Sequence, residues 1–195
     1  LGGVIWLLAW AHFLLTHGPT TSDNEETFLG LSYYDSTKLT VFAIALCMVG
    51  IVSLWTRRPA EVQTWTWTLG HFLAVSALSV MSAGLAVSVW SVPWGETTRV
   101  STTLTDYAFV SAMIASLFAF VGLTLLGIGV VRTKVLHDMD VAPLAIAGLA
   151  AVPWIHHTLH GMFIGLGWLT VGYALRGLDT EGRHAAAPSH RPAKA

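Results

Sequence analysis

The stretch that decides the fold is VAPLAIAGLAAVPWIHHTLHGMFIGLGWLTVGYAL, residues 141–175, which contains no Asp, Glu, Lys or Arg. As one helix it would be about 50 Å long, whereas a bilayer core of about 30 Å takes roughly 20 helical residues. Pro153 is the natural break, because proline is poorly tolerated inside a helix and well placed in the first turn of a new one. We therefore predict two helices here, the first of them short.

The rest of the chain is also dominated by apolar runs. Apolar residues make up 54% of the sequence and charged residues 11%, against roughly a quarter charged in soluble domains. Four more runs are almost free of charge: residues 3–16, 39–55, 67–90 and 108–131. Lipid leaves no partner for unpaired backbone groups, and the strict alternation of a barrel strand is absent. The predicted fold class is all-α, a polytopic transmembrane bundle of six helices.

The basic residues predict how the six helices are threaded. Lys and Arg near helix ends gather on the cytoplasmic side. Six crossings leave only Lys38 and Arg99 outside and place the other basic residues inside, namely Arg57, Arg58, Arg132, Lys134, Arg176, Arg183, Arg191 and Lys194. Five crossings would remove this bias. We therefore expect three in-out-in hairpins with both termini cytoplasmic.

The two ends of the chain differ in character. The run 3–16 is short for a crossing and the sequence opens on Leu1, so we expect a truncated first helix; a cleaved signal peptide is the alternative. The bundle is predicted to cover residues 1–176. Residues 177–195 are small, polar and contain proline, which favours a disordered cytoplasmic tail.

Composition also limits the partners and the location. The formal net charge is −1 and no basic cluster is dense, which argues against nucleic-acid binding. Abundant Ala, Val and Trp with little Lys or Asn is typical of bacteria with GC-rich genomes, so we expect a bacterial plasma membrane. The expected partners are the lipid bilayer and either another membrane protein or a second copy. Gly161 and Gly165 share a helix face, as do Ser76, Ser79, Ser82 and Ala86, and both stripes favour contacts within the bundle.

Four histidines form the candidate site. His12 is predicted in the outer half of the first helix, and His156, His157 and His160 in the opening turns of the last. Histidines three or four residues apart share a helix face, and imidazole suits zinc, copper and iron. A transition-metal site built from these residues is therefore a hypothesis, with Asp106 as its orienting partner or fourth ligand.

Three other interpretations of the histidines stay open. In the first, His12 together with His157 or His160 could hold a b-type haem between two helices. A single haem level argues against a full electron carrier. In the second, the imidazoles sense pH by titration. In the third, which we favour, they have a structural role and bind water, backbone carbonyls and one another. Asp106 likewise has a structural explanation as the N-cap of the fourth helix.

No catalytic motif emerges from the sequence. It shows no nucleophile elbow, no glycine-rich phosphate loop and no paired carboxylates within an apolar run, and Asp106 is taken as the only carboxylate close to one. We therefore expect a non-enzymatic membrane component or accessory subunit. The alternatives are a small-solute or ion transporter or channel, and a metal- or haem-binding membrane protein.

Overall fold

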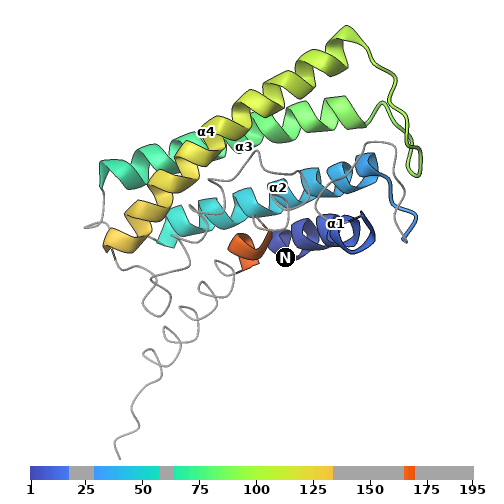
Figure 1. Cartoon of the computed structure of the whole chain (residues 1–195). Coiled ribbons are helices and arrows are strands. Elements are labelled where there is room, and N and C mark those ends of the chain that lie inside the picture. Colours follow the sequence, from blue (N-terminus) through green and yellow to red (C-terminus); the bar gives the residue numbers. More distant parts are fainter. Residues whose placement is uncertain (18–28, 58–63, 134–164, 170–195) are drawn as a thin grey trace, which may run out of the picture.

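The computed structural model describes residues 1–17, 29–57, 64–133 and 165–169. Its helices are α1 (Gly2–His17), α2 (Tyr33–Arg57), α3 (Trp65–Val89) and α4 (Thr103–Thr133), and residues 165–169 form a further helical turn (Figure 1). Three of these, α2, α3 and α4, are long and apolar enough to cross a membrane, whereas α1 is apolar but shorter. Within these residues, the prediction of an all-helical fold is confirmed, with three candidate membrane spans. The break at Pro153, the predicted fifth helix and the tail lie outside the described residues.

The first turn of α2 forms through a reciprocal pair of hydrogen bonds. The backbone N–H of Asp35 donates to Ser32 Oγ over 3.1 Å, and the backbone N–H of Ser32 donates to Asp35 Oδ2 over 3.1 Å. This capping box satisfies two of the backbone donors that a helix start leaves without partners. The helix therefore begins at Tyr33, ahead of the apolar run from which it was predicted.

The start of α4 is capped in the same way by two threonines. The N–H of Thr105 donates to Thr102 Oγ1 over 3.2 Å, and the N–H of Thr102 donates to Thr105 Oγ1 over 2.9 Å. The expected N-cap, Asp106, lies instead within the first turn of the helix. That prediction is wrong because the polar residues before the apolar run are themselves helical.

The contact between α3 and α4, which lie side by side in Figure 1, is the most extensive among the described helices and is made by small residues. A Cβ at Gly70 would strike the backbone of Leu126, and a Cβ at Gly122 would strike the backbone of Ala74. Without side chains at these points the two backbones approach closely, which is how small residues associate helices in membranes. Farther along the same contact, a Cβ at Gly84 would strike the backbone oxygen of Ala108 and meet Ala112. The alanines that lie between these points at helical spacing, Ala77, Ala115 and Ala119, are also buried.

Glycines also bring α1 against its two neighbours. A Cβ at Gly2 would meet Ala43 and Cys47 of α2, and one at Gly3 would meet Gly165 and Leu169. A Cβ at Gly165 would in turn meet Leu7, so the turn at residues 165–169 runs antiparallel to α1. The prediction that Gly165 makes a contact within the bundle is confirmed, whereas Gly161 lies outside the described residues.

The predicted serine stripe on α3 does not lie in the seam with α4. Ser76 and Ser79 are exposed, and Ser82 and Ala86 are half-buried. Ser79 Oγ is 3.4 Å from Met48 Sδ, so this edge of α3 faces α2.

Successive described helices run antiparallel, which gathers four helix ends at one place. Trp10 pairs with Thr40, Phe42 packs on Trp90, and Gly84 lies against Ala108. The C-termini of α1 and α3 therefore meet the N-termini of α2 and α4. We call this the His12 end of the bundle.

Candidate functional site

The His12 end contains a buried ion pair that belongs to the first candidate span. Asp35 and Lys38 are one helical turn apart on α2, with Lys38 Nζ 3.2 Å from Asp35 Oδ1. Each side chain is only 1% exposed. Removing two charges from water costs several kcal/mol per ion, and the pair recovers this only if further hydrogen bonds complete it.

Those further bonds come from both sides of the pair. Asp35 Oδ2 accepts from Ser32 Oγ at 2.9 Å and from the backbone N–H of Gly95 at 2.9 Å, besides the cap bond. The Lys38 ammonium lies over the Trp94 ring, 4.6 Å from its centroid, which is within range of a cation–π attraction. Gly95 and Trp94 belong to the α3–α4 connection, so the ion pair joins that connection to the head of α2.

The α3–α4 connection covers the ion pair on one side of α2. At about 100° per residue, Asp35 and Lys38 share the side of α2 that carries Phe42 and Val49. Both of these apolar side chains are exposed farther along the helix. At the head of α2 the connection covers the same side, where its Val92 packs with Val89 and Tyr34 in a small apolar cluster.

His12 is a buried histidine with both ring nitrogens engaged. Its Nδ1 is 3.1 Å from the carbonyl oxygen of Leu8, which can only accept, so Nδ1 carries the proton. Its Nε2 is 3.1 Å from Ser36 Oγ and is then the acceptor for that hydroxyl. The side chain is 3% exposed. This arrangement is that of a structural histidine joining α1 to α2.

The metal and haem hypotheses remain predictions, because His156, His157 and His160 lie outside the described residues. Among the described residues, no group of three His, Cys, Asp or Glu side chains could hold a metal ion. His12 lies about 140° around α1 from Leu7, the residue that contacts the turn at residues 165–169. His12 is therefore on a different side of α1 from that contact. A ligand role for His12 Nε2 would require Ser36 to move away.

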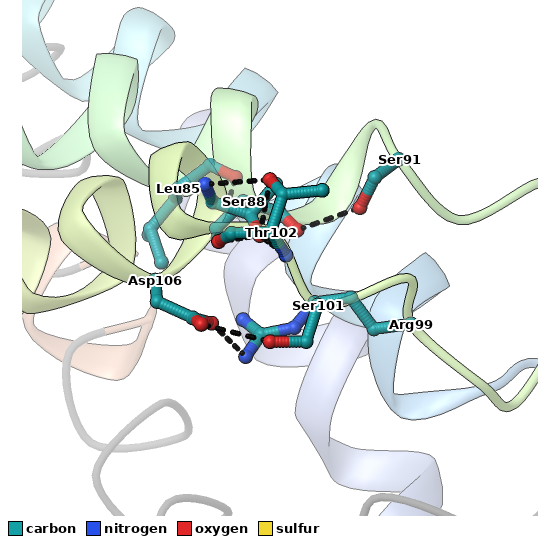
Figure 2. A network of polar contacts seen from close by, with 8 residues as sticks. Leu85, Ser88, Ser91, Arg99, Ser101, Thr102 and Asp106 are labelled. Atoms are coloured by element: carbon teal, nitrogen blue, oxygen red, sulfur yellow. Dashed lines mark hydrogen bonds and ion pairs between the residues drawn. The ribbon is translucent and has the colours of Figure 1, made fainter.

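The contacts of Asp106 are made with the α3–α4 connection. Its Oδ1 accepts from Arg99 Nη2 at 2.9 Å and its Oδ2 accepts from Ser101 Oγ at 2.8 Å (Figure 2). The Asp106 side chain is half exposed, and an exposed pair of this kind contributes little to stability. The structure therefore gives both carboxylate oxygens of Asp106 a local partner, and neither partner is a histidine.

Sequence reasoning missed Asp35, and the inference that Asp106 is the only carboxylate close to an apolar run is wrong. The overlooked signal is the spacing in SYYDSTK, residues 32–38. Ser32 and Asp35 have the spacing of a capping box, and Asp35 and Lys38 that of a charge pair on one helix face. Together they extend the helix upstream of its apolar residues.

A second polar link between α1 and α2 provides a test of how this end is held. Trp10 Nε1 donates to Thr40 Oγ1 over 2.9 Å, and both side chains are buried. Thr40→Val keeps the shape but leaves the indole N–H without an acceptor, so we expect a loss of about 1–3 kcal/mol in the free energy of unfolding. Denaturant unfolding of the purified protein in detergent measures the loss. Thr56→Val, which removes an exposed hydroxyl, is the control and should change little.

The polar groups of the His12 end therefore bind one another. Asp35, Lys38 and His12 are each occupied by protein atoms within the described part of the chain. The arrangement holds two helices and a connection together and presents no open ligand position among those groups. No protein-family model, curated protein or solved structure matches this chain.

Proposed function

We propose that this chain is a non-enzymatic component of the bacterial plasma membrane, an accessory subunit built from transmembrane helices. The main observation in support of this proposal is that the exposed sides of the candidate spans are apolar. The exposed large apolar residues of α2, α3 and α4 include Leu46, Val49, Leu69, Phe72, Val80, Val87, Val110, Ile114, Leu117 and Val121. Exposed apolar surface of this extent is costly in water and suits contact with lipid tails.

The length of α3 supports this placement. Its first residue, Trp65, and the residue that ends it, Trp90, are both substantially exposed. At about 1.5 Å per residue the helix is about 37 Å long, a few ångströms more than the hydrocarbon core at each end. Tryptophan favours those two interfacial levels. The exposed apolar face of α3 lies between the two rings.

The charge distribution supports a His12 end outside the cytoplasm. Lys38 and Arg99, the two basic residues expected outside, are paired with Asp35 and Asp106. Arg132 lies in the last turn of α4, at the opposite end. The antiparallel contact between α1 and residues 165–169 also suits an even number of crossings with both termini cytoplasmic.

A structural role, rather than transport or catalysis, is supported by how the buried charges are used. A coupled transporter needs an ionisable group that can change its partner or its proton. Asp35 and Lys38 are instead completed by Ser32, Gly95 and Trp94. Charges bound in this way hold the helices together.

The test of this proposal is cysteine accessibility in cells. In a Cys47→Ala background, Thr97→Cys should react with an impermeant maleimide from outside, whereas Thr56→Cys should react only after lysis. Reaction of both from one side would contradict the topology. Release of the protein by alkaline carbonate would contradict membrane insertion, and purification of the chain without any partner in mild detergent would contradict the role of accessory subunit.

A further inference from the structure

The α3–α4 connection carries two tryptophans, each with one side packed on α2 and the other exposed. The Trp90 ring meets Phe42 edge to face with centroids 5.9 Å apart, and the Trp94 ring covers the Lys38 ammonium. Trp90 is 49% exposed and Trp94 is 54% exposed. Both rings therefore present an indole surface beyond the end of the apolar span.

The surroundings of these rings match a membrane boundary. Trp90 follows directly on the exposed apolar face of α3, which ends with Val87. On the neighbouring helix, Tyr107 near the start of α4 is 71% exposed. Indole and phenol rings favour the headgroup level, where one part of the ring is in apolar surroundings and its polar atom is hydrated. Charged and hydroxyl side chains lie in the same connection and at the start of α4, where Asp106 binds Arg99 and Ser101 (Figure 2).

We propose that residues 90–96 form an interfacial strap, which binds the headgroup layer of the bilayer with Trp90 and Trp94 and is held to α2 by Asp35 and Lys38. The partner of this surface is phospholipid at the glycerol and headgroup level. The inference rests on the proposed membrane function and adds to it a surface at which the connection lies on lipid instead of extending into water.

The attachment of the strap depends on one carboxylate and one glycine. Gly95 has a positive φ of 82°, a backbone conformation that residues with a side chain rarely adopt. Its N–H donates to Asp35 Oδ2. That bond positions Trp94 over Lys38. The strap in turn keeps the ion pair from both water and lipid, which explains how two charges stay buried where α2 leaves the bilayer.

The experiment is a depth measurement by electron paramagnetic resonance in phosphatidylcholine–phosphatidylglycerol nanodiscs. Spin labels are attached at Glu96→Cys in the strap and at Val80→Cys in the middle of α3, each in a Cys47→Ala background. Collision with oxygen and with a nickel chelate gives the depth of each label. We expect the Val80 label deep in the hydrocarbon and the Glu96 label at the headgroup level.

The outcomes separate the strap from the membrane function itself. A deep Val80 label together with a Glu96 label as accessible to nickel as free label in water would overturn the strap alone. A water-exposed Val80 label would overturn the membrane proposal. Gly95→Ala, which strains the attachment and spares the ion pair, should move the Glu96 label outward into water. Asp106→Asn, which removes the other carboxylate bound to this connection, should leave its depth unchanged. An unmoved label in Gly95→Ala would contradict the role of the attachment.

Discussion

Asp35→Asn is expected to lower the free energy of unfolding by about 3–5 kcal/mol, because it leaves the Lys38 ammonium buried without a counter-charge. The asparagine amide also keeps only one acceptor oxygen, whereas the carboxylate accepts from Ser32, Gly95 and Lys38. Unfolding of the purified protein by sodium dodecyl sulfate in mixed micelles, followed by circular dichroism, measures the loss.

The matched control for Asp35→Asn is Asp106→Asn. Both changes remove the charge of a carboxylate paired with a basic residue at the same end of the bundle, but the Asp106 side chain is half exposed. Exposed pairs contribute about 0–1 kcal/mol, so the control should unfold close to the wild type. Equal losses in the two variants would show that burial of the Asp35 pair does not matter.

Comparing a double variant with a single variant separates the cost of an unpaired buried charge from the cost of lost contacts. Asp35→Leu combined with Lys38→Met removes both charges, and replacing a buried ion pair by apolar residues is often neutral or stabilising. Here the N–H of Gly95 loses its acceptor, so we expect some loss to remain. The double variant should nevertheless be more stable than Asp35→Leu alone.

Gly122→Ala is expected to destabilise the bundle by about 1–3 kcal/mol, the usual range for overpacking a close contact. The new methyl group would strike the backbone of Ala74, which cannot rotate away as a side chain could. The seam between α3 and α4 would have to open. In an ordinary helix the same change stabilises by up to about 1 kcal/mol, so the sign alone identifies the contact.

The control for Gly122→Ala is Gly129→Ala in the same helix. A Cβ at Gly129 would lie 3.1 Å from Trp67 Cα, which is tight but less close than the approach of a Cβ at Gly122 to the backbone of Ala74. The same detergent unfolding assay should give a clearly smaller loss for this variant than for Gly122→Ala. A gain in stability from Gly122→Ala would show that the two helices do not meet at this point.

The existence of the long helices was predictable from sequence, but their polar starts were not predicted. Runs of apolar residues long enough to cross lipid have few alternatives to a helix, because their backbone groups must bind one another. The apolar criterion discards the polar turns at Tyr33 and Thr103, which capping hydrogen bonds make helical. Capping spacings have to be considered together with hydropathy to place such boundaries.

The candidate site illustrates what a single sequence leaves out. The buried Asp35–Lys38 pair is contacted by Gly95 and Trp94, which are distant in the chain and meet α2 only in the folded bundle. The partner of His12 is a serine, and no spacing rule connects position 12 to position 36. On α3, small residues occur on more than one face, and only the position of α4 decides that Gly70 and Ala74 form the seam.

The contact of Gly3 with Gly165 and Leu169 has a consequence for biosynthesis. α1 is synthesised well before residues 165–169, the segment against which Gly3 packs. Before that segment exists, α1 can already pack on α2, through Gly2 and the Trp10–Thr40 bond. The packing of α1 is therefore completed only after residues 165–169 have been synthesised.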